Sequence, residues 1–164
     1  MDEAEKKRLL LSGEWRDWIV AEALTWKFTP YQHKSRLKGI GVDCGGLLYE
    51  VYAPLLGPFK AFPEDYPPDW AAHKDGNELY LDFILPYTAQ VTAVPKGGFT
   101  LFHYGRNFSH AAIWTGTKYL HAFGRNNVGF VKESPIMFFT TRAGQLRDTK
   151  HFDVSKEWLH SFFL

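Results

Sequence analysis

The only cysteine of this 164-residue chain, Cys44, lies where a glycine-rich segment runs into an apolar helical pattern. Asp43 precedes it and is a common helix-capping residue, so the sequence predicts a helix from Cys44 to about Leu56 with the thiol in its first turn. The unpaired N–H groups and positive dipole at a helix N-terminus favour a thiolate and can lower a cysteine pKa to about 3.5–7.5. Cys44 is therefore a candidate nucleophile. The alternative is a small buried apolar residue without chemistry, because free cysteine is among the most buried residue types.

Two histidines, His110 and His121, flank a predicted β-hairpin whose turn would be Gly116-Thr117. With that two-residue turn, the residue opposite His121 is Ala112. The residue opposite His110 is Phe123, so the two imidazoles lie diagonally on one face, roughly 7–8 Å apart at the backbone. Imidazole rings can bridge this distance. A three-residue loop would place the histidines on opposite faces, so the strand register tests the prediction.

A thiol nucleophile needs a base that takes its proton, and the base works better when a third polar group holds its ring in the productive tautomer. Cys44, His110 and His121 could fill these three roles. They could instead ligate zinc, since three protein ligands and a water form a typical catalytic zinc site, although neither HExxH nor CxxC spacing is present. For His121 alone, a partly buried core position is the simpler interpretation.

Other glycine-rich motifs do not predict a cofactor. Gly39-Ile-Gly41 begins like a dinucleotide fingerprint, but Cys44 stands where the third glycine should be. No Gly-Lys-Ser or Gly-Lys-Thr follows a glycine-rich loop, so a phosphate-binding loop is not predicted either.

The elements that must position these residues are helices first and strands second. An amphipathic helix is predicted from about Glu14 to Lys27, and another from Trp70 to Leu85 beyond a proline-rich irregular loop. After Gly97-Gly98, short β-rich runs predict a meandering antiparallel sheet with strands at Phe99–Tyr104, His110–Trp114, Tyr119–Phe123 and Val128–Val131. This order indicates an α+β fold, and the length predicts a single domain over residues 1–164.

Composition restricts the class of protein. Hydrophobic residues make up 45% and charged residues 23%, as in a globular domain, whereas the aromatic share of 17% is high and suggests either a flat core or a lined groove. A net charge of +1 does not attract nucleic acid, and the cluster of Lys34, Arg36 and Lys38 indicates a solvated loop. No apolar run approaches 18 residues, so no membrane span is predicted. The run Leu9–Leu11 is too short for a signal peptide, so we expect synthesis in the cytoplasm without one.

Four blocks of the sequence resemble, in order, those of the NlpC-type cysteine peptidases of bacterial cell-wall turnover. They are Thr29-Pro-Tyr31, Gly41-Val-Asp-Cys44-Gly-Gly-Leu47, Ser109-His110-Ala-Ala-Ile113 and Leu120-His121-Ala122, and the resemblance covers about Trp15–Phe139. It implies a compact papain-like α+β fold, with N-terminal helices packed on a small antiparallel sheet and the nucleophile at a helix N-terminus. One departure is Pro95-Lys-Gly-Gly98, where the family usually has Pro-Gly-Asp.

The resemblance also implies roles for individual residues. Cys44 would be the nucleophile, His110 its base and His121 the orienting residue. Tyr31 would lie beside the nucleophile and, with the Cys44 backbone N–H, could help hold the oxyanion. The implied reaction is hydrolysis of an amide bond in the peptide stem of peptidoglycan, commonly between the side-chain carboxyl of D-glutamate and diaminopimelate, and it requires no metal or other cofactor.

Two further segments, Tyr66–Trp70 and Gly105-Arg106, resemble the phage-type branch of this family, which is encoded with tail genes. We therefore expect an enzyme that associates with a phage tail, has tail proteins as partners besides the stem peptide, and acts on the cell wall. A catalytically silent tail-assembly or peptidoglycan-binding component on the same fold is the alternative.

Overall fold

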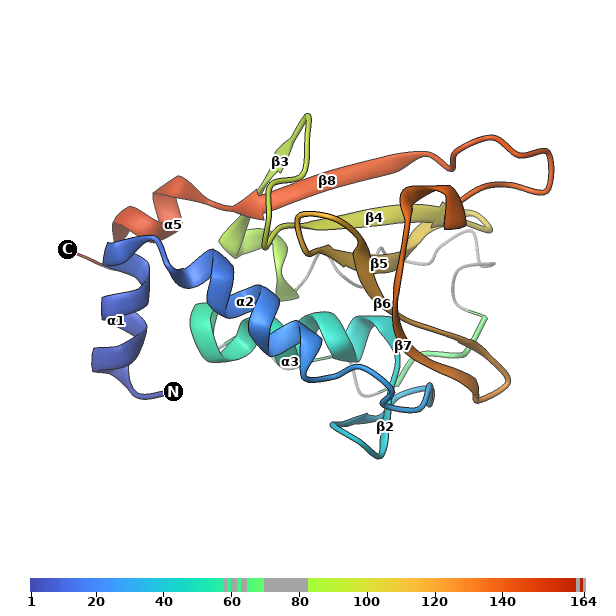
Figure 1. Ribbon diagram of the computed structural model, residues 1–164, viewed down its shortest axis with the longest axis horizontal. Coiled ribbons are helices and arrows are strands. Elements are labelled where there is room, and N and C mark those ends of the chain that lie inside the picture. Colours follow the sequence, from blue (N-terminus) through green and yellow to red (C-terminus); the bar gives the residue numbers. More distant parts are fainter. Residues whose placement is uncertain (58, 60–61, 63–64, 70–82, 162, 164) are drawn as a thin grey trace.

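The computed structural model describes residues 1–57, 59, 62, 65–69, 83–161 and 163. In this part of the chain, helices precede the main sheet, as the sequence predicts, but a two-stranded sheet lies before the helix that begins at Cys44 and a last helix follows the main sheet. The helices Trp15–Leu24 and Cys44–Leu56 pack against each other beside the main sheet (Figure 1). The helices are α1 (Glu3–Ser12), α2 (Trp15–Leu24), α3 (Cys44–Leu56) and α5 (Lys156–Ser161), with short 3₁₀ turns η2 (Leu85–Tyr87) and η3 (Ile136–Phe138). The strands are β1 (Arg36–Leu37), β2 (Gly41–Val42), β3 (Thr88–Val91), β4 (Phe99–Tyr104), β5 (Asn107–Trp114), β6 (Tyr119–Arg125), β7 (Val128–Ser134) and β8 (Thr149–Val154).

Helix α3 is the central helix of the fold and begins at Cys44, as predicted. Its predicted apolar stripe is buried and belongs to the main hydrophobic core, which it shares with α2 and with one face of the sheet. The stripe consists of Leu47, Leu48, Val51 and Leu55. This packing fixes the position of the first turn of α3 relative to strands β5 and β6, which α3 contacts directly.

The main sheet has six strands in the order β3-β8-β4-β5-β6-β7, and its neighbouring strands are antiparallel. In the β5–β6 hairpin, Ile113 pairs with Leu120 and Trp114 with Tyr119. Thr115 N–H donates to the Lys118 carbonyl, which closes the turn at Gly116-Thr117. The predicted register is therefore confirmed.

The two faces of the sheet bury different side chains. One face joins the helical core through residues such as Leu101 and Ile113. The other carries a smaller cluster in which Phe139 stacks on Phe102, with ring centroids 4.0 Å apart. The segment that follows β7 thereby covers the second face of the sheet.

Several elements differ from the sequence-based expectation. Helix α2 ends at Leu24, three residues earlier than predicted, and a turn follows. Helices α1 and α5 and strands β1, β2, β3 and β8 were not predicted. The predicted helix from Trp70 to Leu85 lies largely outside the described residues, and Leu85 itself begins the 3₁₀ turn η2.

The basic cluster is predicted to be a solvated loop, and Lys34 and Lys38 are exposed, whereas Arg36 is half-buried and begins β1. Each of the three cations is paired with a carboxylate. Lys34 pairs with Asp65 at 2.8 Å. The other pairs are Arg36 with Glu50 and Lys38 with Glu22. Within the described part of the chain, no helix has the length and hydropathy needed to cross a bilayer.

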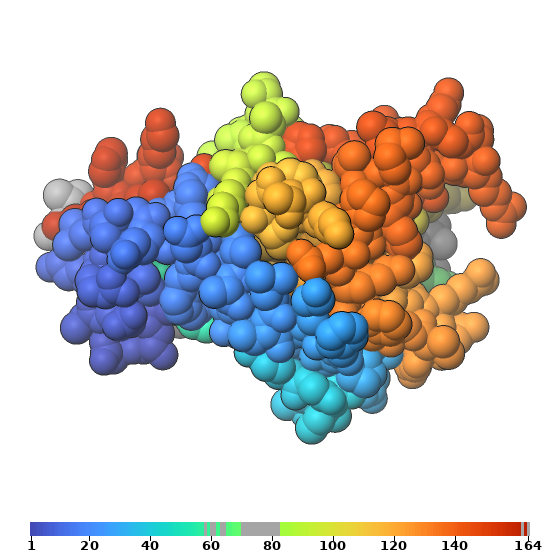
Figure 2. Space-filling view, viewed as in Figure 1, coloured from blue at the N-terminus to red at the C-terminus, as the bar shows by residue number. Residues whose placement is uncertain are grey.

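The first and last helices, α1 and α5, lie together at one end of the long axis of the molecule (Figures 1 and 2). The N-terminus of α3 and the β6–β7 hairpin lie toward the opposite end (Figure 1). A clamp between Arg16 on α2 and Asp153 on β8, with N–O distances of 2.9 and 2.7 Å, joins the helical part to the sheet.

Candidate active site

The thiol of Cys44 lies in the first turn of α3, whose N-cap is Asp43. Asp43 has extended backbone angles, and its Oδ1 accepts a hydrogen bond from Gly46 N–H at 2.8 Å. The sulfur of Cys44 donates to the Ser109 carbonyl oxygen at 3.7 Å, and the residue is only partly buried. The cap thus fixes the helix start, and the neighbouring strand β5 fixes the direction of the thiol.

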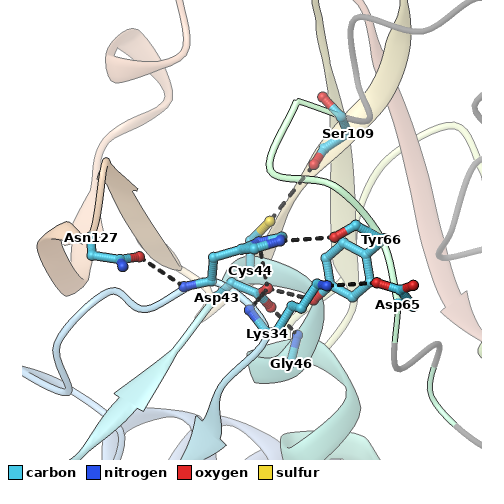
Figure 3. A network of polar contacts seen from close by, with 9 residues as sticks. Lys34, Asp43, Cys44, Gly46, Asp65, Tyr66, Ser109 and Asn127 are labelled. Carbon is cyan, nitrogen blue, oxygen red and sulfur yellow. Dashed lines mark hydrogen bonds and ion pairs between the residues drawn. The ribbon is translucent and has the colours of Figure 1, made fainter.

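The second carboxylate oxygen of Asp43 holds the loop in front of the helix (Figure 3). Oδ2 accepts from Lys34 N–H at 2.9 Å and from the Tyr66 hydroxyl. His33 Nε2 donates to the Tyr66 carbonyl oxygen at 2.9 Å. Burial and the adjacent Asp43 raise the pKa of Tyr66, so its hydroxyl stays protonated and can donate. The segment around Tyr66 is therefore tied to the residue that caps the Cys44 helix.

The structure brings the two hairpin histidines into direct contact. His110 Nε2 lies 2.8 Å from His121 Nδ1, and His121 Nε2 lies 2.9 Å from the Ser134 hydroxyl oxygen. The three residues are 8%, 0% and 3% exposed, respectively, so the chain of hydrogen bonds is sheltered from water. The predicted diagonal placement of the histidines on one face is confirmed.

Burial lowers the pKa of both imidazoles. The nearby Arg147 guanidinium lowers the pKa of His110 further. The pKa of His121 is lowered further by the neighbouring His110 and Lys132. Phe138 and Phe139 pack on His121, with ring centroids 5.1 and 4.9 Å away, and this aromatic cover supplies much of the desolvation. Both rings are accordingly neutral near pH 7, so within the pair one nitrogen donates a proton and the other accepts it.

Cys44 and His110 line the same pocket, which has a volume of about 290 Å³. Tyr31 is also in its wall, and the nearby Cys44 and Asp43 both affect the Tyr31 hydroxyl electrostatically. Gly124 makes this position of Tyr31 feasible, because a Cβ there would lie 2.5 Å from Tyr31 Cγ. Aromatic rings form much of the remaining wall, including those of Phe62, Tyr66, Phe83, Tyr104 and Phe123.

The structure thus brings Cys44, His110 and Tyr31 to one pocket and places His121 behind His110. The zinc alternative needs three converging ligands, and among the residues that the structure describes no three His, Cys, Asp or Glu side chains are grouped to hold a metal ion. Cys44 is not a buried core residue, because its side chain reaches the pocket.

Ser134 was missed by the sequence analysis, although the sequence carries a signal for it. Asn126 and Asn127 both have positive φ, at 52° and 57°, and form the two-residue turn between β6 and β7. A two-residue hairpin turn of this kind requires positive φ at both central positions, and asparagine tolerates that conformation better than most residues. Assigning the turn there would have paired Tyr119 with Ser134, on the same face as His121.

Comparison with known proteins supports the fold assignment. A scan against models of protein families gives no match, and a search of curated proteins gives none either. Six solved chains match, among them the crystal structure of the NlpC/p60 domain of the peptidoglycan hydrolase SagA. The TM-score is 0.53 at 23% sequence identity, and the match covers 85% of this chain and 97% of that one. The chain therefore has the papain-like α+β fold of an NlpC/p60 domain.

Proposed function

We propose that the protein is a cysteine peptidase that hydrolyses an amide bond in the peptide stem of bacterial peptidoglycan. The observation that carries this proposal is the pocket in which Cys44, at the start of a capped helix, faces the same space as His110, whose ring is hydrogen-bonded to His121. The likeness in fold to a domain of a peptidoglycan hydrolase supports the substrate class. The four NlpC-type sequence blocks contain Cys44, His110, His121 and Tyr31.

The proposed reaction begins at the thiol. His110 Nε2 is engaged with His121, so His110 Nδ1 is the nitrogen that takes the proton from Cys44. The sulfur attacks the amide carbonyl carbon, and the C–N bond breaks as the imidazolium of His110 returns its proton to the amine. His110 then takes a proton from water, and the resulting hydroxide attacks the thioester carbonyl carbon. The C–S bond breaks to release the carboxylic acid, and the imidazolium of His110 returns its proton to the sulfur, which regenerates the thiol and the neutral ring.

Two donors are proposed to stabilise the negative oxygen of the tetrahedral intermediate: the backbone N–H of Cys44 and the hydroxyl of Tyr31. Burial raises the pKa of Tyr31, and the nearby Cys44 and Asp43 raise it further, so the hydroxyl keeps its proton and can donate. Donors that are fixed before the reaction cost no reorganisation when the charge develops.

The first test is mass spectrometry of fragments released from purified peptidoglycan by the wild-type protein and by Cys44→Ala. Stem-peptide products formed only by the wild type support the proposal and identify the bond. Equal cleavage by both proteins excludes Cys44 as the nucleophile. If both proteins bind the sacculus and release nothing, a silent tail or wall-binding component is favoured instead.

We also propose that the enzyme reaches the cell wall as part of a phage tail. The support is the resemblance of two segments to the phage-type branch. Of the first, Tyr66 to Asp69 are described and Trp70 is not, and the second, Gly105-Arg106, is the turn between β4 and β5. Mass spectrometry of purified phage tails would detect the chain in them, whereas a chain found only in the soluble fraction of a lysate would contradict the association.

A further inference from the structure

The hydrogen bonds behind the proposed base continue past His121 and reach Ser134. The hydroxyl of Ser134 lies on β7, 2.9 Å from His121 Nε2, and the residue is 3% exposed. Across the described residues, no carboxylate forms a hydrogen bond with either imidazole. His121 therefore takes the place next to the proposed base that a carboxylate takes in many catalytic triads, and a neutral hydroxyl, that of Ser134, lies behind His121.

The direction of these hydrogen bonds decides what His110 can do. If Ser134 donates to His121 Nε2, then His121 Nδ1–H donates to His110 Nε2, and the remaining proton of neutral His110 is on Nδ1. In that arrangement Nδ1 cannot act as a base. If Ser134 instead accepts from His121 Nε2–H, then His121 Nδ1 accepts from His110 Nε2–H. His110 Nδ1 then has a free electron pair.

Protonation of His110 leaves only the second direction. An imidazolium carries protons on both nitrogens, so His121 Nδ1 must accept from His110 Nε2. Neutral His121 then carries its own proton on Nε2, and Ser134 is its hydrogen-bond acceptor at 2.9 Å. Without this acceptor, a buried N–H would lose its partner in the state that the reaction requires.

We propose that Ser134 is a positioning residue that accepts a hydrogen bond from His121 Nε2–H and thereby holds His121 in the tautomer that supports a protonated His110. The inference deepens the proposed function and rests on it. Ser134 acts through two other side chains and touches neither the pocket nor the reacting atoms.

The other groups around the pair do not supply this acceptor. Arg147, from the segment before β8, and Lys132, on β7, are cations that disfavour protonation of the histidines. Tyr104 on β4 packs its ring edge-to-face on His110, and Phe138 and Phe139 are apolar. Cys44 on α3 shares the pocket with His110. Among the described residues named here, the thiolate of Cys44 and the acceptor chain that ends at Ser134 favour the imidazolium.

The test uses Ser134→Ala, which removes the acceptor, and Ser134→Thr, which keeps a hydroxyl on the strand. The control is Ser155→Ala, another buried serine, whose hydroxyl instead accepts from Trp158 N–H at the start of α5. The rate of Cys44 alkylation by iodoacetamide is measured from pH 5 to 9, and ¹⁵N spectra of labelled histidine report which ring nitrogen of His121 carries the proton. Neither measurement depends on a peptidoglycan substrate.

In Ser134→Ala, we expect alkylation at pH 7 to be about tenfold slower than in the wild type, because the imidazolium that accompanies the thiolate is less stable. The titration midpoint should move to higher pH, and the His121 signal should change from a proton on Nε2 to a mixture of tautomers. Ser134→Thr should restore both features, and Ser155→Ala should leave them unchanged.

If Ser134→Ala is folded and has the alkylation profile and His121 spectrum of the wild type, the inference is wrong. Should Ser134→Ala not fold, the wild-type protein decides the question alone: His121 protonated on Nε2 supports the inference, and His121 protonated on Nδ1 overturns it. If the shifts occur but no protein releases peptidoglycan fragments, the proposed substrate fails and the positioning role stands.

Discussion

The surroundings of Cys44 favour its charged form, whereas the surroundings of His110 disfavour its charged form. Cys44 lies at the positive end of the α3 dipole, which favours its anionic form. His110 is buried near Arg147, which disfavours its cationic form. The proposed proton transfer from Cys44 to His110 is therefore favoured at the sulfur and disfavoured at the ring, and the hydrogen bond from His110 to His121 offsets part of that disadvantage.

Tyr31 has a proposed catalytic role that can be tested separately from substrate binding. Tyr31→Phe keeps the aromatic wall and removes one donor, so we expect kcat to fall about 10- to 100-fold with little change in KM. Steady-state kinetics on a soluble stem peptide would measure both constants.

Tyr52→Phe is the matched control for Tyr31→Phe. The Tyr52 hydroxyl donates to the Gly97 carbonyl at 2.7 Å inside the core and does not line the pocket. Its loss should cost about 1 kcal/mol of stability and leave kcat unchanged. An unchanged kcat in Tyr31→Phe would remove Tyr31 from the oxyanion site.

At the scale of elements, the sequence predicted those parts of the site that local patterns define. The helix beginning at Cys44 has a cap and an apolar stripe, and the β5–β6 hairpin has a recognisable turn, so both were found. Helix α1 also carries start and stop signals, in the Asp2 cap and in Gly13 with φ 78°, which could have predicted it.

Strand β8 shows why the rest could not be predicted. Thr149–Val154 has only two buried apolar residues, Phe152 and Val154, and its partner β4 lies about fifty residues earlier. The pairing of β8 therefore depends on long-range contacts that cannot be predicted from its local sequence pattern. The same limit applies to the Tyr66–Asp43 hydrogen bond, which joins a proline-rich loop to a helix cap.

The double use of Asp43 leads to a stability prediction. Asp43→Ala removes the cap of α3 and also leaves Lys34 N–H and the buried Tyr66 hydroxyl without their acceptor. We expect a loss of about 2–4 kcal/mol in the free energy of unfolding, from the cap and the orphaned donors together. Urea denaturation of wild type and variant measures it.

Asp2→Ala is the control, because it removes only a helix cap: Asp2 Oδ1 accepts from Glu5 N–H at 2.8 Å in an exposed position. This variant should lose only about 1 kcal/mol. Equal losses in the two variants would mean that the second carboxylate oxygen of Asp43 contributes nothing to stability.

At the scale of the whole molecule, the buried histidine pair makes stability depend on pH. Folding lowers the pKa of His110 and His121 below the usual value of 6.5, so below that pH the unfolded chain binds more protons than the folded one. Stability is therefore present near pH 7 and is lost as the pH falls, by up to about 1.4 kcal/mol per pH unit for each imidazole.

Urea unfolding between pH 5 and 7 would show this slope, in a range where most carboxylates stay ionised. His121→Gln should reduce the slope. His151 is less buried and its pKa is also lowered, so the comparison variant His151→Gln should reduce the slope less. A stability that is constant from pH 5 to 7 would contradict the burial of neutral imidazoles.

The placement of α1 and α5 at the end of the molecule opposite the start of α3 has a consequence for attachment (Figure 1). A carrier joined through either helix would be attached at the end away from Cys44, so that the pocket would remain accessible to a polymer that the carrier contacts. The same geometry suits fusion of a fluorescent protein or an affinity tag. A fused protein or tag at α1 or α5 would not block the access of an insoluble polymer to the pocket.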